Sequence, residues 1–198
     1  MRIASSLLSR TKRLCSRFLR YPQRFKAYRS LMGSLNLRRI SHRIATVEDA
    51  PGIRRLNAEC YGREDDLDWV VNGIESLKGK GFYLVSALGK RIVGILVIRN
   101  YPENQELYPD WWIFGLMVNS RYRGRGIGEG LVRMALQEAA AQGAAKVYLW
   151  VFEHNKVAIN LYRKLGFQRD SIPKLDAQLE EEAKKQGSRR IIMSKKLV

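Results

Sequence analysis

The sequence has few of the residues that build metal sites or disulfide frameworks. Two cysteines, Cys15 and Cys60, and two histidines, His42 and His154, occur among its 198 residues. Because thiolate metal sites and disulfide scaffolds need several closely spaced ligands, we predict no bound metal and a reducing, cytoplasmic compartment. The sequence also lacks any apolar run approaching the roughly 20 residues of a membrane-spanning helix.

Acidic residues are missing from the first 43 residues, which carry 12 Lys/Arg. The rest of the chain holds 24 Lys/Arg against 19 Asp/Glu, so most of the net charge of +17 belongs to the N-terminal segment. This near balance, and the lack of a known nucleic-acid reader motif, argues against a nucleic-acid-binding domain. We therefore predict a basic segment over 1–42 and one globular domain over 43–198.

Residues 1–40 have the pattern of a basic amphipathic helix, which Pro22 would bend or interrupt. Arginines lie beside or opposite an apolar stripe that recurs every seven residues, at Leu7, Leu14, Tyr21, Tyr28 and Leu35. Three interpretations stay open. The helix binds an anionic membrane surface, as a peripheral attachment, or it is a transit peptide to an organelle matrix, or it docks on its own domain or a partner protein.

The stretch from Trp111 to Gly143 has the order strand, glycine-rich basic turn, helix. The run over 111–118 is rich in aromatic and branched residues, which favours a buried strand, and apolar residues recur at helical spacing over 131–139. Such a turn places free backbone N–H groups at a helix N-terminus, where the helix dipole also favours an anion. Its glycines leave the backbone open, so the turn is predicted to bind a pyrophosphate.

Three kinds of phosphate-binding turn differ in what accompanies the glycines. A Walker loop needs Lys-Ser/Thr after its last glycine, whereas Glu129 follows Gly128 here. The dinucleotide fingerprint would need a glycine at position 129. The remaining pattern, Arg/Gln-x-x-Gly-x-Gly/Ala, is matched by Arg123, Gly126 and Gly128. It resembles the acyl-coenzyme-A loop of the GNAT superfamily of N-acyltransferases; a flexible turn between strand and helix is the simpler alternative.

A second motif follows one predicted strand later, after the apolar run over 146–152. Asn155, Ala158 and Tyr162 are spaced so that they share one face of a helix. Asn155 suits the helix N-cap, and Gly166 suits its C-terminal stop. The string N-x-x-A-x-x-x-Y-x-x-x-G-F is similar to the closing motif of GNAT proteins.

The resemblance covers residues 43–198 and implies an α+β, three-layer fold with a mixed, mostly antiparallel sheet flanked by helices. The N-terminal basic amphipathic helix would precede it. Residues 38–42 are expected to be a linker and 101–110 a loop. Besides the elements of the two motifs, the periodicity and turn signals predict strands over 43–46, 82–87, 91–98, 167–171 and 190–197, and helices over 47–61, 68–77 and 174–186.

The resemblance also implies where acetyl-CoA, the expected co-substrate, binds. In GNAT proteins the strand before the loop separates from its neighbour at a bulge, and its free backbone groups pair with the pantetheine arm. The implied coenzyme-binding residues are Leu116, Met117, Val118, Arg123, Gly124, Arg125, Gly126, Ile127, Gly128 and Asn155. A backbone N–H near Val118 would polarise the thioester carbonyl. Asn155 is equally explained as a helix cap.

The implied activity is direct transfer of an acetyl group from acetyl-CoA to an amine of an acceptor, without a metal. Tyr162 matches the family's general acid, which protonates the departing sulfur; packing in the core is its alternative role. The alternative function is an acyl-CoA-binding sensor, or a membrane-associated module, that keeps the GNAT fold without transferase activity.

The general base and the acceptor are not readable from these motifs. Some relatives carry a glutamate in the strand where Trp150 stands here, which argues against a protein N-terminus as acceptor. Asp110, Glu153 and His154 are candidate bases, each also explained as a surface residue, and a water chain would serve as well. The aromatic residues that could wall an acceptor pocket, or simply belong to the core, are Trp69, Tyr101, Tyr108, Trp111 and Trp112.

Overall fold

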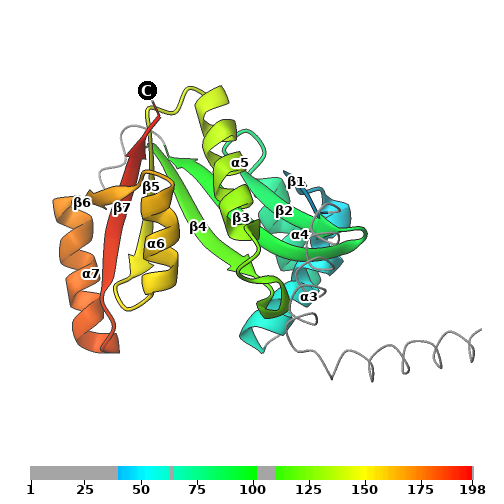
Figure 1. The fold of residues 1–198 in the computed structure, drawn as a ribbon, viewed down its shortest axis with the longest axis horizontal. Coiled ribbons are helices and arrows are strands. Elements are labelled where there is room, and N and C mark those ends of the chain that lie inside the picture. Colours follow the sequence, from blue (N-terminus) through cyan, green and yellow to red (C-terminus); the bar gives the residue numbers. More distant parts are fainter. Residues whose placement is uncertain (1–39, 63–64, 102–109, 198) are drawn as a thin grey trace, which may run out of the picture. The chain divides into compact units, whose positions relative to one another are not determined.

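The computed structural model describes residues 40–62, 65–101 and 110–197 (Figure 1). The predicted N-terminal amphipathic helix and Tyr108 lie outside these residues. The elements, in chain order, are β1 (Ile40–Ile44), the 3-10 turn η1 (Val47–Asp49), α3 (Ala50–Tyr61), α4 (Leu67–Ser76), β2 (Gly81–Leu88), β3 (Arg91–Tyr101), β4 (Asp110–Val118), the 3-10 turn η2 (Ser120–Tyr122), α5 (Ile127–Ala141), β5 (Lys146–Phe152), α6 (Lys156–Lys164), β6 (Gln168–Asp170), α7 (Pro173–Gln186) and β7 (Arg190–Lys196).

The seven strands form one sheet in the order β1-β2-β3-β4-β5-β7-β6. The pairs β2–β3, β3–β4, β5–β7 and β6–β7 are antiparallel, and β4–β5 is parallel. Helices cover both faces, so the predicted mixed, mostly antiparallel sheet flanked by helices is confirmed (Figure 1). The parallel pair arises because α5 carries the chain back between β4 and β5, as a crossover connection must.

Local sequence sets the helix ends where capping chemistry predicts them. Asp66 caps α4, since its Oδ1 accepts the backbone N–H of Asp68 at 2.8 Å. At the end of α6, Phe167 N–H donates to Tyr162 O and Gly166 N–H to Arg163 O, both at 3.0 Å. This is a Schellman motif with Gly166 in the left-handed region (φ 88°), the conformation that favours glycine at this position.

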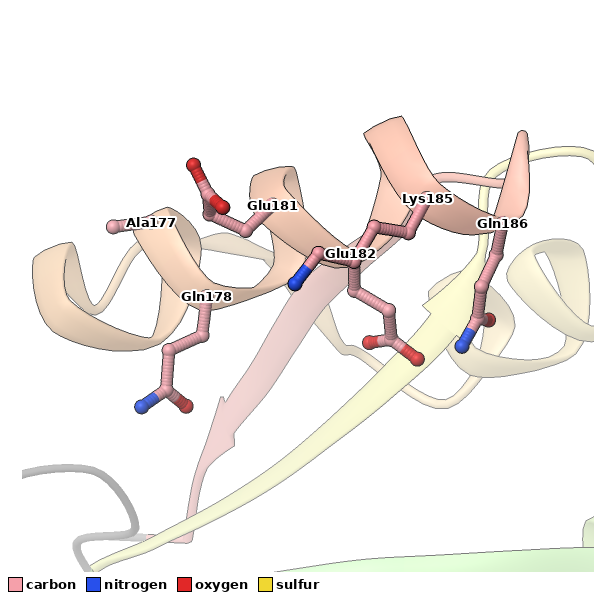
Figure 2. A pocket seen from close by; sticks show the side chains of 6 residues that line it. All are labelled: Ala177, Gln178, Glu181, Glu182, Lys185 and Gln186. Carbon is pink, nitrogen blue, oxygen red and sulfur yellow. The ribbon is translucent and has the colours of Figure 1, made fainter.

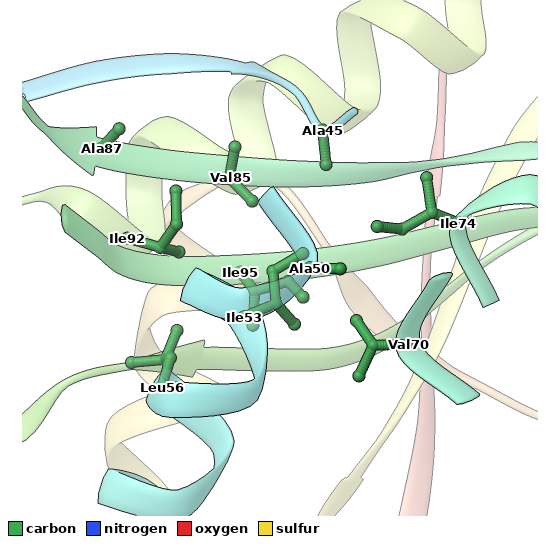
Figure 3. Packing of buried hydrophobic residues seen from close by; sticks show 10 residues of the cluster. All are labelled: Ala45, Ala50, Ile53, Leu56, Val70, Ile74, Val85, Ala87, Ile92 and Ile95. Carbon is green, nitrogen blue, oxygen red and sulfur yellow. The ribbon is translucent and has the colours of Figure 1, made fainter. Parts of the chain in front are cut away.

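Two buried clusters hold the helices to one face of the sheet. The first lies beneath α3 and α4 and includes Ile53, Leu56 and Val70 against Val85 and Ile95 (Figure 3). The second lies beneath α7, where Leu175 and Leu179 pack on Trp112, Tyr148 and Ile192. The opposite face carries α5 and α6, which contact each other through an ion pair between Glu129 and Lys164 at 2.6 Å.

Three local predictions were wrong. Residues 40–42 belong to β1 and are not a linker. The helix expected over 47–61 begins with the 3-10 turn η1, because Pro51 has no N–H to bond Val47 O and Ala50 N–H takes that carbonyl instead. Trp69 has the spacing of an apolar face in the helix predicted over 68–77, together with Val70 and Ile74, but its side chain is 61% exposed.

Candidate functional site

The parallel strands β4 and β5 separate part-way along their length (Figure 1). Their pairing is confined to three positions, Trp111–Val147, Trp112–Tyr148 and Ile113–Leu149. Within the described residues, β4 from Phe114 to Val118 pairs with β3 alone. One edge of β4 therefore faces an opening, and its backbone groups there have no neighbouring strand to bond.

A β-bulge marks the point of separation. Ile95 of β3 faces Met117 and Val97 faces Phe114, so β4 carries one more residue than β3 between these pairs. Gly115 lies in the bulge with φ 63°, in the left-handed region that glycine adopts without steric cost. The expected bulge in the strand before the loop is confirmed.

The register indicates which backbone groups of β4 point into the opening. Asn119 N–H donates to Val93 O at 2.9 Å, so Asn119 and Val93 form a hydrogen-bonded pair of the antiparallel ladder. In an antiparallel ladder such pairs alternate with non-bonded ones, so Val118, opposite Gly94, turns its N–H and C=O away from β3. Met117, by the same alternation, turns its backbone groups toward β3.

The glycine-rich loop joins this open end of β4 to α5. Gly124 (φ 71°) and Gly126 (φ 79°) both adopt the left-handed conformation, and no atom would lie within 4 Å of a Cβ at either position. Gly126 is the N-cap of α5, and Gly130 N–H donates to Gly126 O at 2.9 Å. The N–H groups of 127–129 precede that first bond, so they emerge from the helix N-terminus.

Several charged side chains around the loop already interact with other groups of the chain. Arg123 Nε donates to Val118 O at 2.9 Å, which ties the loop to the open end of β4. The Arg125 guanidinium lies 5.7 Å from the Tyr122 ring centroid. Glu129 in the first turn of α5 would oppose an anion, but hydrogen bonds from Lys164 and then Arg133 hold the pKa of its carboxyl below the ordinary value and offset its charge.

The helix α6 carries the second motif. Asn155 Oδ1 accepts the backbone N–H of Ala158 at 3.1 Å, so its role as N-cap is confirmed. Tyr162 is 6% exposed, and its ring meets Phe167 edge-on with centroids 5.7 Å apart. Burial raises the pKa of the Tyr162 phenol to about 12, so the hydroxyl keeps its proton at neutral pH.

The chain also matches a model of a known family. The model for the acetyltransferase (GNAT) family matches residues 50–167, which is more than half of the sequence and contains both motifs. The chain belongs to the GNAT acetyltransferase family.

Relatives share parts of this GNAT domain. Mycothiol acetyltransferase of Corynebacterium glutamicum is 45% identical over 80 residues, which are 40% of this chain and 25% of that protein. An uncharacterized N-acetyltransferase of Methanocaldococcus jannaschii is 31% identical over 114 residues, 58% of this chain and 50% of that protein. The chain thus spans half or less of these curated relatives.

A solved structure agrees with the GNAT fold over a longer range. The yncA protein of Salmonella typhimurium, determined with acetyl-CoA, superposes with a TM-score of 0.64 over 81% of this chain and 95% of its own. Sequence identity is 16%, so this similarity concerns the fold.

The candidate bases have other partners in this GNAT domain. The Asp110 carboxylate accepts the backbone N–H of Lys146 at 2.8 Å, and so fixes the start of β5 beside β4. Glu153 pairs with Arg169 at 3.8 Å, and His154 stacks on Phe152 with centroids 5.3 Å apart. These contacts are structural, while Trp150 packs edge-on against Phe114 at 5.4 Å in the position where some GNAT relatives carry a glutamate.

The aromatic candidates for an acceptor pocket divide between core and surface. Trp111 and Trp112 are 4% and 0% exposed and belong to the core. Tyr101 lines a cavity of about 230 Å³ beside α4, together with Arg99 and Phe114. Trp69 lines a second cavity of about 170 Å³ between α3, α4 and β4.

A larger hollow of about 410 Å³ lies along α7, but all six residues that line it come from that single helix (Figure 2). They are Ala177, Gln178, Glu181, Glu182, Lys185 and Gln186. A ligand site gathers groups from several elements, so this hollow is an outer face of α7.

Sequence reasoning missed one residue that shapes the site. Glu59, near the end of α3, accepts hydrogen bonds from Asn119 Nδ2 and, at 2.7 Å, from Arg91. Asn119 is 5% exposed, and its Oδ1 accepts Arg121 N–H at 3.0 Å, which starts the turn into the loop. Asn119 is recognisable as a cap after a strand, but its partner lies 60 residues away in the sequence.

Residues 40–62, 65–101 and 110–197 contain neither a metal-binding cluster nor a membrane-spanning helix. No group of three or more His, Cys, Asp or Glu in these ranges is arranged to hold a metal ion. No helix there has the length and hydropathy to cross a bilayer.

Proposed function

We propose that this chain transfers an acetyl group directly from acetyl-CoA to an amine. One observation carries the proposal: β4 opens from β5 beside a glycine-rich loop that leads into the N-terminus of α5. A strand edge with free backbone groups suits an amide-containing chain such as pantetheine. A helix N-terminus without side chains over it suits a pyrophosphate.

The described residues fit the coenzyme. The pyrophosphate would be held by the backbone of Arg123, Gly124, Arg125, Gly126, Ile127 and Gly128, where no side chain fills the space above Gly124 and Gly126. The pantetheine arm would pair with the open edge of β4 over Leu116, Met117 and Val118, and register favours Val118 for the backbone contacts. Asn155, at the start of α6, would support the arm besides capping its helix.

The transfer forms a bond between the amine nitrogen and the acetyl carbon and breaks the bond between that carbon and sulfur. The amine loses one proton, to a water chain or another base, and the leaving sulfur gains one. The Val118 N–H, turned toward the opening, would polarise the carbonyl as charge develops on its oxygen. Tyr162 would supply the proton to sulfur.

The high pKa of Tyr162 bears on this role. A phenol with a pKa of about 12 stays protonated, so it is ready to donate in each cycle. It is a weaker acid than a solvated thiol, with a usual pKa near 8.5, so transfer needs a sulfur whose basicity is raised by the same burial. An enclosed site provides that, because desolvation penalises the thiolate as it does the phenolate.

A sensor that binds acyl-CoA without transfer is the second candidate. The loop and the open strand would serve a sensor equally, whereas a proton donor is needed for transfer alone, and the buried, protonated Tyr162 is suited to that role. This favours the enzyme.

We further propose that the protein is cytoplasmic, with residues 1–40 attaching it peripherally to an anionic membrane surface or to a partner protein. The support is compositional: this segment combines an apolar stripe with arginines and has no acid. Residues 1–42 would thus form a region separate from the transferase domain over 43–198.

An acceptor screen tests the activity. The protein is incubated with acetyl-CoA and a panel of amines while free thiol is followed. We expect acceptor-dependent thiol release with formation of the acetylated amine. Tight coenzyme binding with no acceptor-dependent release, across amines of varied size and charge, would favour the sensor.

A further inference from the structure

The cavity between α3, α4 and β4 contains a buried polar atom that forms no hydrogen bond with any described residue. Asn57 is 8% exposed and lines this cavity of about 170 Å³. Its Nδ2 donates to Asp65 Oδ2 at 2.5 Å, while its Oδ1 is buried and has no hydrogen-bond partner among the described residues. Leaving a buried acceptor unpaired is unfavourable, so this oxygen is suited to a donor supplied by a ligand.

The cavity combines that polar end with an apolar floor and an aromatic rim. Ile53, Val70 and Ile95, which belong to the core cluster beneath α3 and α4, form the floor (Figure 3). Tyr61 and Trp69 at the rim are 65% and 61% exposed. Large aromatic side chains held so far in solvent lose apolar burial, which a ligand resting on them would restore.

The cavity reaches β4 at its bulge, on the face opposite the glycine-rich loop. Gly115 and Met117 line it. Leu116 and Val118 project to the other face, since their side chains lie 3.6 Å and 3.9 Å from a Cβ built at Gly128 on α5. The open edge of β4 therefore lies between the loop on one side and the cavity on the other, so an acceptor here would approach a coenzyme on that edge from the opposite face.

Negative charge adjoins the unpaired oxygen. Asp65 places its carboxylate on the Asn57 amide, and its field extends to Tyr83, another lining residue, whose pKa is raised first by burial and then by Asp65. An N–H donor that also carries a positive charge would bond the Asn57 oxygen and be favoured by the neighbouring carboxylate, and a primary ammonium is the compact group with that chemistry.

We propose that this cavity selects the acceptor, and that the acceptor is a primary amine borne on an apolar or aromatic group. Its nitrogen bonds Asn57 Oδ1 beside Asp65, and its apolar part rests on Tyr61 and Trp69. This assignment rests on the proposed acetyl transfer. Drug-sized ligands usually occupy about 300–1,000 Å³, so a cavity of about 170 Å³ takes the amine end of an acceptor while the remainder lies across the rim.

Direct binding separates this assignment from the activity. The full chain, with saturating coenzyme A, is titrated by calorimetry with 2-phenylethylamine, with 2-phenylethanol as the uncharged analogue and with methylamine as the amine lacking an apolar body. We expect 2-phenylethylamine to bind at least tenfold more tightly than either control. Equal affinity for all three, or tightest binding of the alcohol, would overturn the assignment.

Three variants locate the binding, and a fourth serves as the control. Asp65→Asn keeps an oxygen for the Asn57 amide and removes the charge, Trp69→Ala removes the rim ring at an exposed position, and Asn57→Leu removes the unpaired oxygen. Each should raise the KM for 2-phenylethylamine by about five- to twentyfold and leave coenzyme affinity within twofold. Glu181→Gln on α7 removes a carboxylate far from the cavity, and is the matched control with no expected effect. If Asn57→Leu fails to fold, Asp65→Asn and Trp69→Ala decide the question.

The results distinguish failure of the cavity assignment from failure of the proposed acetyl transfer. Amine binding that depends on Asp65 and Trp69, without any thiol release, supports the cavity assignment and contradicts the acetyl transfer. Acetylation of amines with a KM that none of the three cavity variants changes supports the transfer and overturns the cavity assignment.

Discussion

The two halves of β4 have similar composition and different surroundings. From Trp111 to Ile113 the strand pairs on both edges, and its two tryptophans are buried. From Phe114 to Val118 it pairs, within the described part of the chain, with β3 only, and no side chain in this half of the strand is fully buried. A continuous apolar run thus specifies a core strand in its first half and, beyond the bulge, an edge available to a ligand.

The difference comes from a few backbone constraints. Asp110 adopts φ 61° and bonds Lys146 N–H, which holds the two strands together at the paired end. Gly115 permits the bulge that redirects the strand. If the open half serves chemistry and the paired half serves stability, substitutions should affect one property and spare the other.

The largest effect is expected at Tyr162, the proposed proton donor for the reaction at the open half. Tyr162→Phe keeps the ring that packs on Phe167 and removes the hydroxyl. General acid catalysis contributes about 10²–10⁴-fold, so turnover should fall by that factor while coenzyme affinity stays level. Single-turnover rates with a saturating amine measure this without interference from product release. Equal rates for both proteins would remove Tyr162 from the mechanism.

The paired half should dominate stability. Trp112 is 0% exposed and stacks on Tyr148 with centroids 5.1 Å apart, so Trp112→Ala should lower the free energy of unfolding by about 3–5 kcal/mol. Leu116→Ala, in the open half, is the matched variant and should lower it by less than about 2 kcal/mol because the side chain is only half-buried. Urea denaturation measures both. Similar losses would mean that the two halves are equally part of the core.

The loop should tolerate a side chain at one glycine and not at another. Gly126→Asp places a carboxylate at the N-terminus of α5, on a residue with φ 79°, and coenzyme affinity should fall at least tenfold. In Gly128→Ala the new methyl group meets Leu161 at an ordinary 3.5 Å, so affinity should stay within about twofold. Calorimetry on the folded variants gives both values, and an unchanged affinity in Gly126→Asp would exclude the loop from coenzyme binding.

The fall in rate caused by ionisation of the general acid should lie at high pH. A Tyr162 pKa of about 12 means that the donor loses its proton only far above pH 10, so its ionisation should lower the single-turnover rate by less than about twofold between pH 8 and 10. An ordinary phenol, with a pKa near 10, would be half ionised at the upper end. A decline centred near pH 10 that disappears in Tyr162→Phe would show a solvated hydroxyl.

The smallest effect on the site is expected from removal of the N-terminal segment. A chain starting at Arg38 keeps all of β1, which begins at Ile40, and should bind coenzyme as the full chain does. It should lose binding to anionic vesicles, which a sedimentation assay measures with neutral vesicles as the control. Aggregation or weaker coenzyme binding would instead mean that the segment docks on the domain.

Local signals predicted most of the fold. β5 was expected over 146–152 and occupies that range, because a short apolar run between a glycine and a capping asparagine has few alternatives. The cap at Asn155 and the stop at Gly166 also followed from residue type. These features depend on neighbours within a few residues, which the sequence shows directly.

Features that depend on distant partners could not be predicted this way. The contact of Glu59 with Asn119 joins residues far apart in sequence, and the cavity at Asn57 exists because α3, α4 and β4 meet. Trp69 fits an apolar helical face by spacing, yet it lies exposed beside that cavity because the face of α4 toward the core is already filled by Val70 and Ile74. Residue spacing in the sequence did not show which polar side chains meet at the site.

The junction between β4 and β5 has a consequence for the dynamics of the protein. Three residue pairs join the β1–β4 part of the sheet to the β5–β7 part. Local opening generally follows units with few shared contacts, so amide protons on the two parts should exchange with solvent in two separate groups. A molecule bound along the open edge of β4 would add contacts across this junction and bring the two exchange rates together. Hydrogen-exchange measurements would therefore report occupancy of the site at the scale of the whole sheet.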